Sequence, residues 1–160
     1  MELYLFRHGI AEDRMPGHPD SSRQLTEEGR KKTALVAKMA RASGVKPSLI
    51  ISSPFDRAMQ TAEAAAKEFG YEGKILQSRT LVPDGSPHVV WNELRNYPEE
   101  PAILLAGHEP LLSQLTAHLL SAPSLQVEMK KSAMVRIDID SRRTAPQGVL
   151  RWMIVPALAG

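Results

Sequence analysis

The chain has 160 residues, 42% of them hydrophobic and 24% charged, which predicts one globular domain over residues 1–160 and excludes a largely disordered chain. Its formal net charge is +2 and it has no cysteine, so disulfides, thiolate metal sites and a cysteine nucleophile are excluded, and no nucleic-acid partner is expected. The sequence lacks a secretory signal pattern and an apolar segment of roughly 20 residues, so we expect a cytoplasmic protein that does not enter membranes.

The first predicted element is a buried strand over residues 3–6, an apolar segment that ends abruptly in Arg7, His8 and Gly9. In open α/β sheets, ligands bind at the carboxyl ends of the strands, which is where these three residues lie. The polar stretch over residues 10–24 is rich in proline and glycine and predicts a loop that leaves this reactive end.

A helix is predicted after this loop, with Thr26 as its N-cap and Gly44 at its end. Two glutamates in its first turn favour the helix start, because they complement the helix dipole. Leu35, Met39 and Ala42 recur at helical spacing, so we expect them to form the face that packs on the core.

Residues 49–52 predict the second buried strand, and the helix after it is expected to end at Gly70. Ser53 is the expected N-cap of this helix, and Pro54 suits its first position because the missing N–H is not needed there. Arg57 then lies in the first turn of a helix that starts at a strand's carboxyl end, where backbone N–H groups favour an anion.

The middle of the chain continues the alternation of strands and helices. Residues 74–77 predict a weak strand, followed by a loop over residues 81–88 and a helix that extends to Tyr97. Residues 102–106 form the clearest buried strand, and Pro110 suits the first turn of the helix after it.

Towards the carboxyl terminus the pattern changes to alternating apolar and charged residues, over 134–140 and 149–155, which predicts an antiparallel pair of strands. The fold class that follows is α/β. We expect a three-layer α/β/α sandwich with a mostly parallel central sheet, helices on both faces and antiparallel strands near the carboxyl terminus.

Four side chains are expected to converge at one edge of this sheet: Arg7, His8, Arg57 and His108. Two guanidinium groups match phosphate oxygens and can stabilise transition-state charge. A neutral His8 can attack phosphorus, because the lone pair of its imidazole is then available. A protonated His108 would donate a hydrogen bond to a phosphoryl oxygen.

Three motifs in this order resemble the histidine phosphatase superfamily, with its phosphoglycerate mutase-like fold, and in particular its small SixA-type branch of phosphohistidine phosphatases. The motifs are Arg7-His8-Gly9, Ser52-Ser53-Pro54 with Arg57 and Gln60-Thr61, and Gly107-His108. The resemblance implies a phosphohistidine intermediate on His8, held by Arg7, Arg57 and His108 and hydrolysed by water without a metal or other cofactor. For this branch it also implies a role in signal transduction, with a phosphorylated protein such as a histidine phosphotransfer domain as substrate.

The proton donor is less clear from the sequence. Family members use a carboxylate from the mid-chain loop or beside the second histidine, which makes Glu109 and Asp84 candidates, with Glu12 behind them. Glu109 has another interpretation, as a carboxylate that stabilises a helix N-terminus. If the substrate is phosphohistidine, the leaving imidazole needs less protonation than an alkoxide, and a dedicated acid is less important. Loops 10–24 and 81–88 are expected to determine specificity.

Two other functions remain open: a phosphatase of small phosphate esters, and a regulatory module that binds phosphate or a phosphoprotein without turnover. A metal site fits poorly, because arginines beside the histidines would repel a cation. His18 is expected on the surface of its loop, and His88 and His118 are expected on helices without a catalytic role. The sequence leaves the oligomeric state open.

Overall fold

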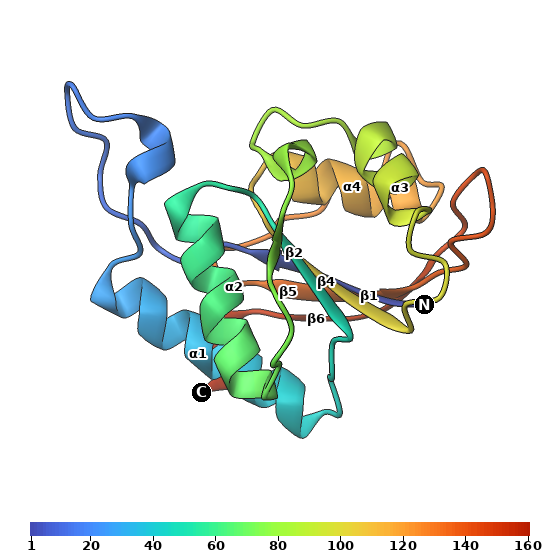
Figure 1. Cartoon of the computed structure of the whole chain (residues 1–160), viewed down its shortest axis with the longest axis horizontal. Helices are drawn as coiled ribbons and strands as arrows, with labels where there is room; N and C mark the ends of the chain where they lie inside the picture. Colours follow the sequence, from blue (N-terminus) through green and yellow to red (C-terminus); the bar gives the residue numbers. More distant parts are fainter.

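The computed structural model describes residues 1–160, which form one six-stranded sheet with helices on both faces (Figure 1). The strands are β1 (Glu2–Arg7), β2 (Leu49–Ser52), β3 (Leu76–Gln77), β4 (Ala102–Gly107), β5 (Met134–Asp138) and β6 (Val149–Ile154). The helices are α1 (Glu27–Ala42), α2 (Asp56–Phe69), α3 (Pro87–Leu94), α4 (Leu111–Leu119) and α5 (Pro156–Ala159), with the short 3₁₀ helices η1 (Asp20–Ser22) and η2 (Arg79–Leu81). None of the helices is long and apolar enough to cross a membrane.

The sheet has the strand order β3-β2-β4-β1-β5-β6. The pairs β3–β2, β2–β4 and β4–β1 are parallel, whereas β5 is antiparallel to both β1 and β6. The predicted fold class is therefore confirmed, including the antiparallel strands near the carboxyl terminus. Because β1, β2 and β4 run the same way, their carboxyl ends lie along one edge of the sheet.

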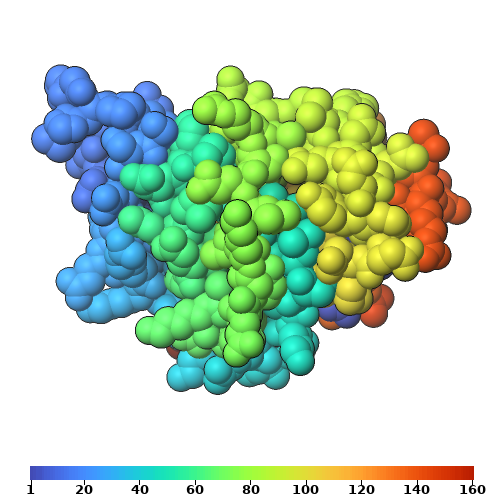
Figure 2. Space-filling model, in the orientation of Figure 1, coloured from blue at the N-terminus to red at the C-terminus, as the bar shows by residue number.

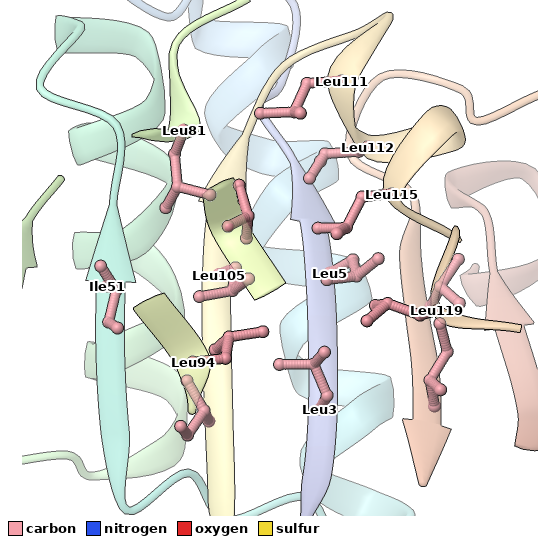
Figure 3. Packing of buried hydrophobic residues seen from close by; sticks show 14 of the residues in the cluster. Leu3, Leu5, Ile51, Leu81, Leu94, Leu105, Leu111, Leu112, Leu115 and Leu119 are labelled. Atoms are coloured by element: carbon pink, nitrogen blue, oxygen red, sulfur yellow. The ribbon is translucent and has the colours of Figure 1, made fainter. Parts of the chain in front are cut away.

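Side chains alternate between the two faces of β1 and build two hydrophobic cores. Leu3 and Leu5 pack with residues of α3 and α4, which cover one face (Figure 3). Tyr4 and Phe6 pack with residues of α1 and α2 on the other face. A strand that is buried on both faces has a continuous run of apolar residues, which explains why β1 could be predicted from the sequence.

The predicted face of α1 is wrong. Val36, Ala37 and Ala40 are fully buried, whereas Met39 is 40% exposed and Ala42 is also exposed. Apolar residues in α1 are frequent enough to fit more than one helical stripe, and the hydrophobic spacing alone cannot choose between them. Helix α1 packs against α2, whose core face also includes small buried residues. This contact selects Val36, Ala37 and Ala40 as the buried side of α1.

Several boundaries differ from the predictions. The strand predicted over residues 74–77 is reduced to a two-residue β3, and α3 ends at Leu94 rather than at Tyr97. Pro110 is the N-cap of α4 instead of lying in its first turn. The helix expected to start at Pro54 begins at Asp56. Thr26 is the N-cap of α1 as predicted, and Gly70 ends α2 in the left-handed conformation.

Candidate active site

The two histidines of the site are brought together by the pairing of β1 with β4. The register places Arg7 beside Gly107, so the next residues along each strand, His8 and His108, emerge side by side. The His8 N–H donates to the Gly107 carbonyl at 3.0 Å and fixes this junction. The two imidazole rings lie 5.0 Å apart between centroids, inclined by 56°.

The hydrogen bonds of His8 define which nitrogen is free to react. Its Nδ1 lies 2.7 Å from the Gly9 carbonyl oxygen. A carbonyl only accepts, so the ring proton is on Nδ1 and the lone pair is on Nε2. Burial, supported by the nearby charges of Arg57 and Arg7, lowers the pKa of His8 to about 3. The imidazole is therefore neutral at physiological pH, as a nucleophile requires.

Gly9 allows the chain to turn tightly after His8. A Cβ at this position would lie 2.6 Å from the Thr33 hydroxyl and 2.9 Å from the Gly29 carbonyl oxygen, both in α1. The Gly9 N–H also donates to the Thr61 hydroxyl of α2 at 3.2 Å. Glycine is needed here because α1 approaches the backbone of the motif too closely for a side chain.

Arg57 is the second residue of α2 and its guanidinium is almost fully buried. Its Nε donates to His8 Nε2 at 3.3 Å, and its outer nitrogens donate to Asp20, at 2.8 Å to the carbonyl oxygen and 3.0 Å to Oδ2. The Thr61 hydroxyl donates to the Arg57 carbonyl at 2.8 Å. This network orients the guanidinium towards the lone pair of the nucleophile.

Ser53 has a role that the sequence did not predict. It is not the N-cap of α2, because that position is taken by Phe55 without a side-chain cap. Its Oγ accepts from the Phe55 N–H at 3.3 Å and lies 2.8 Å from His108 Nε2. The hydroxyl proton is free to be donated to His108 Nε2, and this arrangement is compatible with a neutral ring that carries its proton on Nδ1.

His108 is neutral in the free protein. Its ring is fully buried at the end of β4, and the burial, supported by the neighbouring His8, lowers its pKa to about 2. The protonated form considered from the sequence is therefore not the resting form. A neutral imidazole still has one N–H to donate, and a bound dianion would favour additional protonation.

Two buried nitrogen atoms at the site have no hydrogen-bond partner. Arg7 Nη1 donates to the Met129 carbonyl at 2.7 Å, but Arg7 Nε and His108 Nδ1 are buried without any hydrogen bond. Unpaired buried donors are rare and costly in proteins. Together with the positive charges of Arg7 and Arg57, they indicate a site prepared for an anion with several acceptor oxygens.

Asp20 is a site residue that sequence reasoning missed. It lies in η1, on the loop over residues 10–24, which forms a projection beside the start of α2 (Figure 2). Besides Arg57, its carboxylate accepts from Arg23 at 2.9 Å and lies 3.5 Å from Arg14. These cations hold the pKa of Asp20 below its ordinary value although burial opposes them. The available signal was Arg57 itself, since a buried guanidinium requires a negative partner.

The three proton-donor candidates do not approach His8 Nε2 through any hydrogen bond. Glu109 Oε1 accepts from the Ser113 N–H at 2.8 Å, which is the alternative role at a helix start, although its charge also favours the protonated form of Arg7. Glu12 accepts from the Gln24 N–H at 3.4 Å in the exposed loop. Asp84 is exposed beyond η2.

The other histidines lie away from the four converging side chains. His18 is exposed in its loop. His88 of α3 and His118 of α4 pack with ring centroids 4.3 Å apart, at a surface cavity of about 610 Å³ that includes neither His8 nor His108. No group of three or more histidines and carboxylates has the arrangement of a metal site.

Comparison with known proteins places this geometry in a family context. Residues 3–79, which include Arg7, His8 and Arg57, match the model of the histidine phosphatase superfamily (branch 1). An uncharacterized protein of Picosynechococcus is 40% identical over 117 residues, which cover 71% of this chain and 70% of the relative. The phosphohistidine phosphatase SixA of Escherichia coli is 26% identical over 158 residues, with 98% and 94% of the two chains covered. A structure of the protein histidine phosphatase SixA with tungstate superposes with a TM-score of 0.87 at 26% identity, over 98% of each chain.

Proposed function

Because this chain belongs to the histidine phosphatase superfamily and to its SixA-type members, we propose that it is a metal-independent phosphatase that removes phosphoryl groups from phosphohistidine on a protein. The proposed protein substrate is a component of a signal-transduction pathway, such as a histidine phosphotransfer domain. The observation that carries the proposal is the orientation of His8, whose Nδ1 proton is held by Gly9 while the Nε2 lone pair lies beside Arg57.

In the first step, the lone pair of His8 Nε2 attacks phosphorus as the bond to the substrate imidazole breaks. The electron pair of that bond stays on the leaving nitrogen. Arg7, Arg57 and His108 donate hydrogen bonds to the phosphoryl oxygens, whose charge they stabilise in the transition state. The two arginines supply the positive charge that a metal ion supplies in other phosphatases.

In the second step, water attacks phosphorus and the bond to His8 Nε2 breaks, which releases inorganic phosphate and returns the neutral imidazole. The hydrogen bond from His8 Nδ1 to Gly9 stabilises positive charge on the ring while it carries the phosphoryl group. The same donors serve both steps, since the phosphoryl group stays in the same place.

The positions of the carboxylates support phosphohistidine over a phosphate ester. An imidazole, with a pKa of about 6.5, leaves far more easily than an alkoxide and needs little help from an acid. Glu109 is engaged by the first turn of α4, and Asp20 is engaged by three arginines. The arginines hold the pKa of Asp20 below its ordinary value, whereas an acid for an alkoxide would need a raised pKa.

The test compares turnover of a phosphohistidine protein with turnover of aryl and alkyl phosphate esters, with EDTA present. We expect the phosphohistidine protein to be the best substrate and to leave an acid-labile phosphoenzyme, which His8→Ala cannot form. A labelled phosphoenzyme in His8→Ala would refute the role of His8. Faster turnover of esters would favour the ester phosphatase, and phosphate binding without turnover of any substrate would favour the binding module.

A further inference from the structure

A basic groove opens directly beside the candidate active site. It has a volume of about 670 Å³ and is lined by Arg7, Ile10, Lys32, Lys130, Lys131, Val155, Pro156 and Ala157. No acidic residue belongs to the lining. Arg7 belongs both to the groove and to the set of side chains around His8, so the groove and the candidate active site share one cation.

The antiparallel strands explain why this groove lies at the reactive edge. The register places Phe6 of β1 beside Met134 of β5, and Met134 beside Ile154 of β6. The residues that precede β5 and those that follow β6 therefore lie at the same edge as the carboxyl end of β1. These are the two lysines 130–131 on one side and the apolar segment 155–157 on the other.

The charges of the groove are available to a partner. Lys32 and Lys130 form ion pairs with Glu28 and Glu128. All four of these side chains are well exposed, and such pairs contribute little and exchange easily. Lys131 has no acidic side chain within ion-pair distance. Burial and the charges of Arg57 and Arg7 lower the pKa of His8, and the positive charge of Lys131 adds to this effect.

We propose that the basic groove binds an acidic segment of the phosphoprotein substrate, with Lys131 as its central contact and the apolar residues 155–157 as its floor. This inference rests on the proposed function, because it names the kind of protein that presents its phosphohistidine to His8. Carboxylates a few residues from the phosphohistidine meet Lys131, Lys130 and Lys32, while the phosphoryl group meets Arg7. A small phosphate ester fills only the site around His8 and leaves the groove unused.

The experiment uses two phosphohistidine peptides of equal length, one with acidic and one with neutral residues around the phosphohistidine, and 4-nitrophenyl phosphate. We expect the wild-type protein to show a kcat/KM about tenfold higher for the acidic peptide, and less preference at high salt, because salt screens exposed charges. Lys131→Glu should reduce kcat/KM for the acidic peptide about tenfold more than for 4-nitrophenyl phosphate. Lys74→Glu is the matched control, since it changes the net charge equally at the opposite end of the sheet, beside β3.

A second measurement tests peptide binding to the groove without turnover. The unphosphorylated acidic peptide, labelled with a fluorophore, should bind the wild-type protein and the Lys74→Glu control with similar affinity. Its affinity for Lys131→Glu should be about tenfold lower. Equal binding by all three proteins, or equal use of the two phosphopeptides, would overturn the groove assignment. Peptide binding that depends on Lys131, without turnover of either phosphopeptide, would uphold the groove and contradict the proposed phosphohistidine activity instead.

Discussion

Asp20 places a carboxylate on the guanidinium that the proposed mechanism requires for a phosphoryl group. Both outer nitrogens of Arg57 donate to this residue, and the third nitrogen of the guanidinium, Nε, donates to the lone pair of His8 Nε2. In the free protein, three of the five N–H groups of the guanidinium are therefore engaged within the chain, one from each nitrogen. A phosphoryl dianion at Arg57 shares the positive charge of the guanidinium with the Asp20 carboxylate, so this side chain acts as an internal competitor.

Asp20→Asn should bind inorganic phosphate about tenfold more tightly than the wild-type protein, because a neutral amide competes less well for a guanidinium than a carboxylate does. Titration calorimetry measures this directly. Glu12→Gln, which changes an exposed carboxylate of the same loop that does not contact Arg57, is the control. Unchanged or weaker phosphate binding by Asp20→Asn would show that the carboxylate is not a competitor but supports the site.

At the scale of elements, the turn that follows His8 at Gly9 depends on how closely α1 and α2 pack around it. A Cβ built on Gly9 would lie closer to the Thr33 hydroxyl and the Gly29 carbonyl oxygen than real Cβ atoms lie to their neighbours. The Gly29 carbonyl belongs to the backbone and cannot move aside easily. Ile10 is bound in the same region, because its carbonyl accepts from the Thr26 N–H at 2.9 Å. The N-terminal half of α1 therefore packs against the residues that follow His8 and restricts their movement.

Gly9→Ala should lower the free energy of unfolding by about 1–3 kcal/mol, since the added methyl group overpacks a site that cannot relax. Urea denaturation provides the measurement. Gly107→Ala is a suitable comparison, because its nearest contact is the flexible side chain of Leu112 at 3.3 Å, and it should cost less. Equal stability of Gly9→Ala and the wild type would mean that α1 moves away from the turn freely.

The sequence predicted those elements whose pattern has a single interpretation. Fully apolar strands such as residues 102–106 and helix ends such as Gly70 carry local signals, and the alternation of strands with helices then places Arg7, His8, Arg57 and His108 at one edge. The buried face of α1 was not predictable from spacing, because its partner α2 selects among several stripes.

Two features of the site depend on contacts between segments that are distant in the chain. The Ser53 hydroxyl had a plausible local role as an N-cap, but in the structure it contacts a histidine 55 residues later. The contact of Asp20 with Arg57 depends on the path of an irregular loop, which no periodicity encodes. Local propensity describes neither, since both are decided by tertiary packing.

At the scale of the whole molecule, the buried histidines couple stability to pH. Burial lowers the pKa of His8 to about 3 and that of His108 to about 2, whereas both have a pKa of about 6.5 in the unfolded chain. Below pH 6.5 the unfolded state therefore binds more protons than the folded state. This contribution to stability is fully present above that pH and is lost progressively as the pH falls towards 3.

We expect the free energy of unfolding to decrease between pH 6.5 and pH 4.5 by up to about 1.4 kcal/mol per pH unit for each of the two histidines. Urea denaturation at several pH values measures the slope. The variant His108→Gln should show a shallower slope than the wild type, because one titrating group is removed. A wild-type stability that is constant or rises on acidification over this range would contradict the neutral, buried state of these rings.

The central position of β1 has a consequence for how the protein is made. Its neighbours are β4 and β5, which begin about 100 and 130 residues later in the chain. During synthesis β1 therefore waits for partners that lie about 100 residues or more further along the chain, and such long-range pairing is slow. Arg7 and His8 stay unsupported until β4 and β5 have been synthesised, so the candidate active site forms only after β5 has emerged.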